Sequence, residues 1–109
     1  MSEEKKLLFA EIEKEVSENP VLIYIKGEKS MPMCGFSARV VEVFKHLEVP
    51  FETRNVLTNP AKFAALKEWA KWPTSPQLYL NGELVGGCDI IMELFQAGEL
   101  QKMTQQFKE

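Results

Sequence analysis

The pattern of apolar and polar positions predicts helices and strands that alternate along the chain. Near the N-terminus, Leu8, Ile12 and Val16 recur at helical spacing, which predicts an amphipathic helix that ends at the following Asn-Pro pair. Residues 21–26 (VLIYIK) form a continuous apolar run with β-branched side chains, which is typical of a buried central strand. The first quarter of the chain therefore predicts one helix and one core strand.

A second helix is expected directly after Cys34, followed by a second strand over residues 50–56. The apolar residues expected on the buried side of this helix are Phe36, Val40, Val43, Phe44 and Leu47. Because a helix that links two strands of one sheet makes a βαβ unit, we expect these two strands to pair in parallel.

The second half of the chain begins with Asn59 and Pro60, an N-cap followed by proline at the first helical position. The expected buried stripe of this helix consists of Phe63, Leu66 and Ala70. Two short strands then follow, and they are joined at Asn81-Gly82, a strong two-residue hairpin signal.

Two further helices complete the chain. Asp89 is expected to cap the first of them, and Gly98 suits its C-terminal end. The residues expected to face inward are Ile91, Leu94 and Phe95 in this helix, and Leu100, Met103 and Phe107 in the last one. The order of elements predicts an α/β fold in a single domain, residues 1–109, with a central four-stranded mixed sheet flanked by about five helices.

The composition argues against several classes of function. The chain has 109 residues, a formal net charge of −3 and no basic run, so it lacks the positive surface that nucleic-acid binding needs. No apolar stretch is long enough to span a membrane, and the acidic N-terminus is unlike a secretory signal or an Arg-rich transit peptide. Two cysteines cannot build a disulfide framework. We therefore expect a reducing compartment: the cytoplasm, or an organelle matrix if the chain is a processed form.

Cys34 stands where a redox protein places the first thiol of a C-x-x-C pair, but Ser37 occupies the place of the second. At a helix N-terminus the unpaired N–H groups and the macrodipole favour the thiolate, and Lys26 would add a positive charge. These effects would lower the thiol pKa from its usual value of about 8.5, while Gly35 and the small Ser37 leave the sulfur accessible. An isolated cysteine can also be a small core residue, but the polar loop before Cys34 argues against that interpretation.

Two other motifs are candidates for ligand binding. In PTSPQ (73–77), a cis Ser75-Pro76 bond would turn the N–H and C=O of Ser75 outward to pair with an extended peptide. A trans bond is the commoner state, and it would make this segment only a loop. In GGCD, the glycines can point free N–H groups at an anion and Asp89 can accept from a ligand ammonium, although a tight turn explains the motif equally well. Cys88 is either reactive or merely small.

The remaining candidates are expected to have structural roles. His46 has no second histidine or carboxylate at metal-ligand spacing, so it is interpreted as a surface residue near the end of its helix. Phe63, Trp69 and Trp72 are expected to pack in the core and against helices rather than to form a stacking platform.

Three segments together resemble the monothiol glutaredoxins that carry the CGFS signature: Lys26-Gly27, residues 32–37 (PMCGFS) and residues 72–90 (WPTSPQLYLNGELVGGCDI). The resemblance covers nearly the whole chain. It implies a thioredoxin-type fold with Pro76 in the cis form, and a glutathione site along a groove beside Cys34.

The resemblance also implies roles for individual residues. Lys26 would hold the glycine carboxylate of glutathione, and Ser75, next to Pro76, would pair with the cysteinyl backbone. The γ-glutamyl end would be held by backbone groups of Gly87, Cys88 and Asp89 and by the side chain of Asp89.

Two positions depart from the family pattern. Ser75 stands where a bulky apolar residue is usual, and Phe63 stands where members commonly have an arginine that reaches the glycine carboxylate. Lys62 and Lys67 are the nearby cations that could replace this arginine.

The resemblance implies that the protein carries a [2Fe–2S] cluster, which needs four ligands. Cys34 from each of two chains would supply two, and a glutathione thiolate beside each would supply the others. The protein would then be a homodimer when loaded and a monomer when apo. It would deliver clusters to iron–sulfur apo-proteins and pair with a BolA-type protein, with no nucleic acid or membrane as partner.

Other possibilities remain open at this point. Cys34 and Cys88 from each of two chains also make four thiolates, and the two cysteines of one chain could instead form a disulfide. The rival function is a glutathione-dependent disulfide oxidoreductase, in which Cys34 removes glutathione from a protein and passes it to a second glutathione. A third possibility is a module that binds a BolA-type partner without any cluster.

Overall fold

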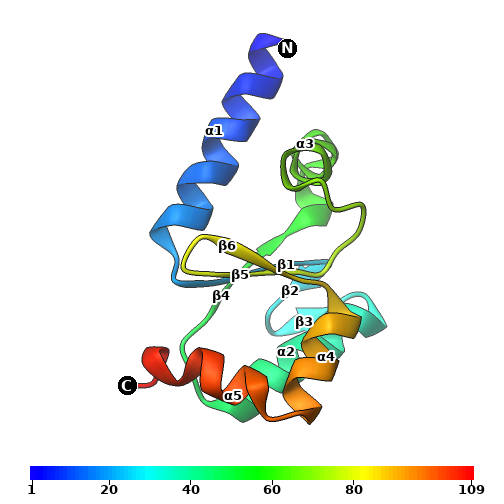
Figure 1. Ribbon diagram of the computed structural model, residues 1–109. Coiled ribbons are helices and arrows are strands. Elements are labelled where there is room, and N and C mark those ends of the chain that lie inside the picture. Colours follow the sequence, from blue (N-terminus) through cyan, green and yellow to red (C-terminus); the bar gives the residue numbers. More distant parts are fainter.

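The computed structural model describes residues 1–109 and contains the mixed sheet that the sequence predicts (Figure 1). Its strands are β1 (Val21–Ile25), β4 (Glu52–Asn55), β5 (Gln77–Leu80) and β6 (Glu83–Gly86), in the order β4-β1-β5-β6. β1 pairs with β4 in parallel, Leu22 opposite Glu52, and with β5 in antiparallel, Leu22 opposite Tyr79. The parallel pairing expected from the βαβ unit is confirmed.

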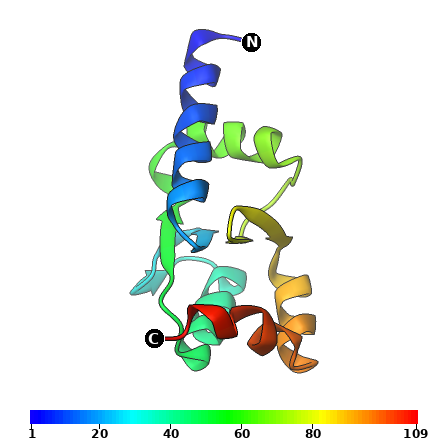
Figure 2. The ribbon, with the colours of Figure 1, turned by 60° about the vertical axis from the view of Figure 1, so that its left-hand side comes forward.

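Five helices cover the two faces of this sheet, so the predicted fold class is confirmed. They are α1 (Glu3–Glu18), α2 (Gly35–Leu47), α3 (Pro60–Ala70), α4 (Cys88–Gln96) and α5 (Glu99–Thr104). α1 and α3 lie on one face, whereas α2, α4 and α5 lie on the other (Figure 1). The N-terminal turns of α1 extend beyond the rest of the molecule in both ribbon views (Figure 2).

The central strand β1 is buried along its whole length because it serves two hydrophobic cores. Val21, Ile23 and Ile25 point toward the face covered by α2, α4 and α5. Leu22 and Tyr24 alternate with them and pack toward α1 and α3. A strand buried on both faces needs a continuous apolar run rather than an alternating one, which explains the sequence VLIYI.

The helix ends follow local capping chemistry, with one correction. The side chain of Asn59 accepts a hydrogen bond from the N–H of Lys62 at 3.1 Å, and Pro60 occupies the first turn, as predicted. The prediction that Asp89 caps α4 was wrong, because α4 already begins at Cys88 and Gly87 is its N-cap. Asp89 instead lies in the first turn, where its negative charge is favourable to the helix dipole.

Two predictions of buried side chains also need correction. Phe36 was expected to face the core, but it is 57% exposed because the inward stripe of α2 starts at the fully buried Ser37. Ala70 is only half-buried, since α3 buries Ala65 and Leu66 near its middle instead.

Three short elements were not anticipated from the sequence. The segment 27–33, expected to be a loop, contains a small hairpin formed by β2 (Gly27–Glu28) and β3 (Met31–Pro32). The other two are the 3-10 helices η1 (Val56–Thr58) and η2 (Gln105–Phe107), the second of which continues the last helix. None of the helices is both long enough and apolar enough to cross a membrane.

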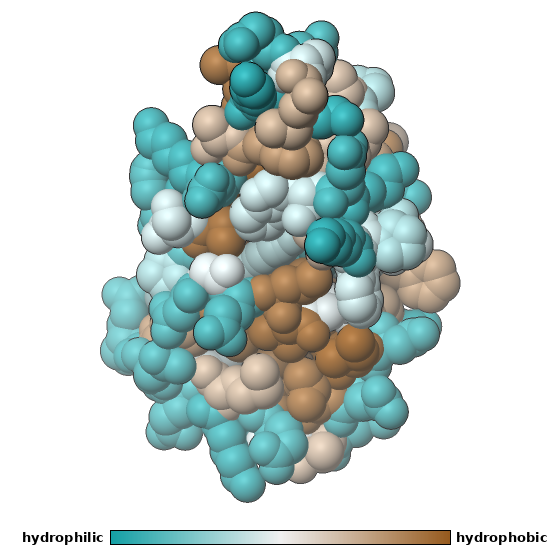
Figure 3. Space-filling model, turned by 45° about the horizontal axis from the view of Figure 1, so that its top comes forward, coloured by the Kyte–Doolittle hydropathy of each residue, from teal (hydrophilic) through white to brown (hydrophobic).

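The face shown in Figure 3 is mostly hydrophilic. In the view of Figure 3, apolar side chains gather in one area in the lower half of the face, and hydrophilic side chains surround it. A surface of this kind is ordinary for a globular domain, because apolar atoms always make up a large part of the exposed area.

Candidate functional site

One groove runs past Cys34 and has a volume of about 580 Å³, within the range of small-molecule sites. It collects residues from the end of β1, the start of α2, α3 with the loop that follows it, and the start of α4. All the site residues expected from the sequence line it, namely Lys26, Cys34, Ser75, Pro76, Gly87, Cys88 and Asp89. The fold thus brings three separate segments of the sequence to one place.

Cys34 is the N-cap of α2, and its thiol is half-buried in the groove wall. A hydrogen bond from the backbone N–H of Ser37 is the main cause that lowers the pKa of this thiol, and partial burial opposes it. The N–H of Phe36, the positive charge of Lys26 and the hydroxyl of Ser37 lower the pKa further. At neutral pH, a larger fraction of Cys34 is therefore in the reactive thiolate form than for an ordinary cysteine.

Ser37 does more than replace a thiol. Its side chain is fully buried, and its hydroxyl oxygen accepts a hydrogen bond from the backbone N–H of Lys26 at 3.0 Å. The N–H of Met33 in turn donates to the carbonyl of Lys26 at 2.8 Å. These two bonds fix Lys26 at the end of β1 beside the first turn of α2, a role that sequence reasoning missed.

Gly27 allows the hairpin to bring the chain back to Cys34. Its φ angle is +96°, and a Cβ there would lie 2.6 Å from both the carbonyl oxygen of Met31 and the backbone nitrogen of Met33. Only glycine fits this combination of a positive φ and such close backbone contacts.

The peptide bond between Ser75 and Pro76 is cis, as the resemblance implies. Gln77, which sequence reasoning did not single out, holds the loop before it. The buried side chain of Gln77 donates to the carbonyl of Thr74 at 3.0 Å and accepts from the hydroxyl of Tyr79 at 2.8 Å. The sequence feature that could have indicated this role is a polar residue at the start of an otherwise apolar strand, because a buried amide needs hydrogen-bond partners.

Gly87 lets the loop after α3 close against α4. A Cβ at this position would lie 3.3 Å from the carbonyl oxygen of Pro76 and 3.3 Å from the Nε1 atom of Trp72. Trp72 therefore forms part of the groove wall, which corrects the expectation that it serves only packing. The Nε1 atom of Trp72 and the hydroxyl of Ser75 are buried without a hydrogen-bond partner.

The other aromatic side chains divide between core and groove. Trp69 stacks on Tyr79 with ring centroids 6.0 Å apart, as expected for a packing role. Phe63 packs against the same core and also lines the groove. His46 is an exposed residue on α2, as predicted, and its ring meets that of Phe95 edge-on.

Cys88 shares the groove with Cys34 but has a different environment. Burial raises the pKa of the Cys88 thiol, and the negative charges of Asp89 and Cys34 add to this, while Arg39 opposes it. Both cysteines are free thiols. At neutral pH, Cys88 therefore stays protonated more readily than Cys34 does.

Comparison with known proteins agrees with this site. The family model for glutaredoxin matches residues 21–85. Glutaredoxin 4 of Pasteurella multocida is 56% identical over 92 residues, which cover 84% of each chain. A probable monothiol glutaredoxin 2 of Rickettsia typhi is 50% identical over 105 residues, 96% of this chain and 93% of the relative.

Solved structures show the same fold. Reduced apo GrxS14 of poplar superposes with a TM-score of 0.79 at 44% identity, covering 91% of both chains. A buckwheat glutaredoxin–glutathione complex superposes with a TM-score of 0.84 at 28% identity, covering 97% of this chain and 96% of the other. The chain is therefore a member of the glutaredoxin family and resembles its monothiol members.

Proposed function

We propose that this protein binds glutathione in the groove beside Cys34 and carries a [2Fe–2S] cluster between two chains. The observation that carries the proposal is the Cys34 thiol, which is half-exposed in a groove of suitable size and has a lowered pKa. The presence of glutathione in the related buckwheat complex supports it.

The charges along the groove fit glutathione, which has an amino-acid group at one end, a carboxylate at the other and a thiol between them. Lys26 supplies a cation, Asp89 supplies an anion, and Cys34 lies in the same groove. We propose that Lys26 holds the glycine carboxylate and that Ser75 pairs with the cysteinyl backbone. Gly87 and Asp89 would hold the γ-glutamyl end at the start of α4.

The cluster is a cargo whose ligands come from more than one molecule. No group of three or more His, Cys, Asp or Glu side chains lies close enough within the chain to hold a metal ion. A [2Fe–2S] cluster needs four ligands. Cys34 of two chains and two bound glutathione thiolates would provide them.

The burial of Cys88 argues against the alternative in which Cys34 and Cys88 of each chain supply all four ligands. A ligand of a cluster shared between two chains must be accessible at the surface, but Cys88 is only 9% exposed, whereas Cys34 is half-exposed. We therefore assign Cys88 to the groove wall.

Exposed apolar side chains around Cys34 support association through this face. Met31, Met33 and Phe36 are 72%, 69% and 57% exposed, and they flank Cys34 in the hairpin and the first turn of α2. We propose that they contact the second chain in the loaded dimer, and a BolA-type protein or an iron–sulfur recipient when the cluster is passed on. The apo-protein would be a monomer, and the free cysteines suit the reducing cytoplasm.

Anaerobic reconstitution with iron, sulfide and a sulfur donor tests the carrier function. Wild type, Cys34→Ser and Cys88→Ser would be compared with and without glutathione by visible absorption and gel filtration. We expect a coloured dimer that needs glutathione and Cys34 and survives the loss of Cys88. Colour without glutathione that disappears in Cys88→Ser would assign the ligands to four protein thiolates and contradict the proposal.

The lowered pKa of Cys34 also favours a second activity, the removal of glutathione from proteins. The Cys34 thiolate would attack the glutathione sulfur of a mixed disulfide, and the protein thiolate would leave. A second glutathione thiolate would then attack the same sulfur, release glutathione disulfide and return Cys34 as a thiolate. Release of glutathione from a glutathionylated peptide by wild type but not by Cys34→Ser would show this activity. No release by wild type would contradict it.

A further inference from the structure

The hairpin of β2 and β3 carries the chain from Lys26, at the end of β1, to Cys34 at the start of α2. Its first strand lies against β4 and its second strand lies against α2. A two-stranded hairpin is only marginally stable by itself, so contacts with its neighbours must hold it in place. The residues that make these contacts therefore decide where Lys26 and Cys34 lie relative to each other.

Asn55, the last residue of β4, holds β2 through its side chain. Its Oδ1 atom accepts hydrogen bonds from the N–H of Gly27 at 3.0 Å and from the N–H of Leu57 at 2.9 Å, and its Nδ2 atom donates to Glu28 at 2.8 Å. Gly27 is buried, so its N–H would be costly to leave without an acceptor. Asn55 does not itself line the groove, so any effect on the groove passes through the residues that it holds.

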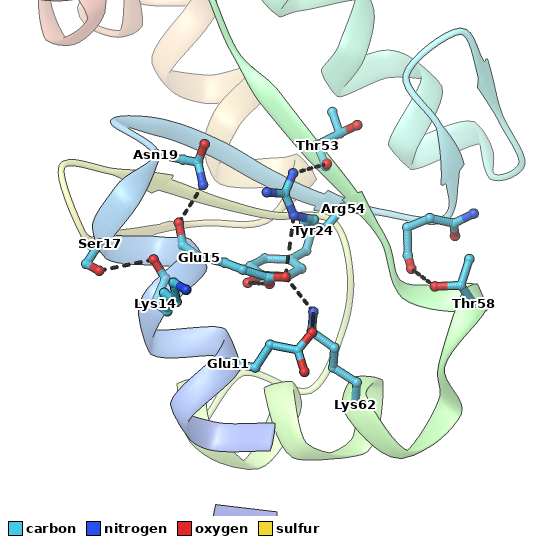
Figure 4. Close-up of polar contacts among 11 residues, drawn as sticks. Glu11, Lys14, Glu15, Ser17, Asn19, Tyr24, Thr53, Arg54, Thr58 and Lys62 are labelled. Atoms are coloured by element: carbon cyan, nitrogen blue, oxygen red, sulfur yellow. Dashed lines mark hydrogen bonds and ion pairs between the residues drawn. The ribbon is translucent and has the colours of Figure 1, made fainter. Parts of the chain in front are cut away.

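The strand that carries Asn55 is itself firmly held. β4 pairs in parallel with the central strand β1. Arg54 donates to the carbonyl of Thr53 at 2.9 Å and pairs with Glu15 of α1 at 3.4 Å (Figure 4). The hydroxyl of Thr58 donates to the carbonyl of Asn55 at 3.0 Å. Asn55 thus links the hairpin to a fixed part of the sheet.

Lys29 holds the hairpin at its other end, in the turn between β2 and β3. Its ammonium group donates to the carbonyl of Phe51 and lies 4.2 Å from the centre of the Phe51 ring. An ammonium over an aromatic face is attracted by the ring. The hairpin is therefore fixed against the β4 segment at its base by Asn55 and at its tip by Lys29.

We infer that Asn55 is a positioning residue for the groove, because it fixes the hairpin that joins Lys26 to Cys34. Gly27, which Asn55 binds, directly follows Lys26, and Lys26 lines the groove. The N–H of Met33, the residue before Cys34, donates to the carbonyl of Lys26 at 2.8 Å. The bonds of Asn55 therefore act one residue away from the groove cation, and the second arm of the hairpin carries their effect to the thiol. The consequence for ligand binding rests on the proposed function.

Amide hydrogen exchange of the apo-protein, measured by NMR, tests this positioning without any ligand. Asn55→Ala removes the acceptor of the Gly27 N–H, so the informative reporter is the N–H of Met33, which bonds to Lys26 and not to Asn55. We expect Asn55→Ala to speed exchange at Met33 about three- to tenfold, because the hairpin opens more often. Asn55→Asp keeps an oxygen acceptor for Gly27 and should restore most of the protection.

Asn59→Ala is the matched control, because the Asn59 side chain also accepts from a backbone N–H, that of Lys62 at 3.1 Å, but caps α3 instead of holding the hairpin. It should leave exchange at Met33 unchanged. Lys29→Met loosens the tip of the hairpin and leaves the bonds of Asn55 in place, so it provides a second test if Asn55→Ala does not fold. We expect it to speed exchange at Met33 about two- to threefold.

Unchanged exchange at Met33 in both Asn55→Ala and Lys29→Met would overturn the inference. Equal acceleration in Asn55→Ala and Asn59→Ala would also overturn it, because the effect would then be a general loss of stability.

Binding of S-methylglutathione, measured by isothermal titration calorimetry, shows whether the position of the hairpin matters for the groove. The methyl group prevents thiol exchange. We expect Asn55→Ala to weaken binding about three- to fivefold, Asn55→Asp to restore most of the affinity, and Asn59→Ala to bind as wild type does. If Asn55→Ala binds as well as wild type, the inference falls and the glutathione site stands. If wild type does not bind, the proposed glutathione site falls, and exchange at Met33 alone decides the role of Asn55.

Discussion

The two cysteines line the same groove at the start of two helices, yet their pKa values move in opposite directions. The two cysteines differ by one position relative to the start of their helices. Cys34 is the N-cap of α2, so the N–H groups of Phe36 and Ser37 reach its sulfur. Cys88 is the first residue inside α4 and is only 9% exposed, so burial dominates. A helix N-terminus thus activates a thiol only when the thiol is placed to accept from its free N–H groups.

The largest difference is expected when each thiol is removed. Cys34→Ser should abolish the rapid alkylation of the native protein by iodoacetamide, because the activated thiolate is gone. Cys88→Ser should leave this rapid reaction almost unchanged. Mass spectrometry of the alkylated chains at neutral pH measures both, and rapid labelling at Cys88 in the native protein would contradict the comparison.

The second-largest effect is expected in the pH dependence of alkylation, which should differ between the two thiols. The Cys34 rate should reach half its maximum below pH 8.5, the usual thiol pKa, whereas the Cys88 rate should do so above it. Between the lowered pKa of Cys34 and its unfolded value, the folded chain binds fewer protons than the unfolded chain. The contribution of Cys34 to the free energy of unfolding is therefore complete above pH 8.5 and is lost as the pH falls through the folded pKa. Identical profiles for the two thiols would refute the assignment.

Ser37→Ala should weaken the Cys34 site selectively. The N–H of Lys26 loses its acceptor, which should lower the free energy of unfolding by about 1–2 kcal/mol. The pKa of Cys34 should rise because the hydroxyl of Ser37 no longer stabilises the thiolate.

Urea denaturation and alkylation profiles measure these two effects. Ser17→Ala is the control, since the Ser17 hydroxyl makes only an exposed bond to the carbonyl of Lys14. A loss of stability as large in the control as in Ser37→Ala would contradict the role given to Ser37.

Arg39→Gln should produce the smallest change, a shift in the pKa of Cys88. The positive charge of Arg39 lowers the pKa of Cys88, so its removal should move the Cys88 alkylation profile further toward high pH. The Cys34 profile should stay in place. A shift at Cys34 with none at Cys88 would show that the two environments have been assigned wrongly.

The fold was predictable from the sequence where a periodic pattern decides the structure. The continuous apolar run of β1, the Asn59-Pro60 helix start and the Asn81-Gly82 hairpin each have one dominant physical cause, and each was found where expected. The small hairpin over residues 27–33 has no such pattern, because it depends on the positive φ of Gly27 and on bonds to the end of β1.

The site was predictable in its residues but not in its arrangement. The resemblance pointed to Cys34 and the loop at Pro76, but it could not show which of Lys62 and Lys67 lines the groove. Those lysines are five positions apart on one helix, and only their partners, Glu15 for one and Phe63 for the other, separate them. In the sequence, Ser37 likewise marks only the place of an absent second thiol. Its structural role follows from the buried hydrogen bond that it accepts from the N–H of Lys26.

Native mass spectrometry of the anaerobically reconstituted protein tests the central claim most directly. The account predicts one species of two chains, one [2Fe–2S] cluster and two glutathione molecules, which is absent in Cys34→Ser and retained in Cys88→Ser. A loaded dimer that contains no glutathione and depends on Cys88 would contradict it.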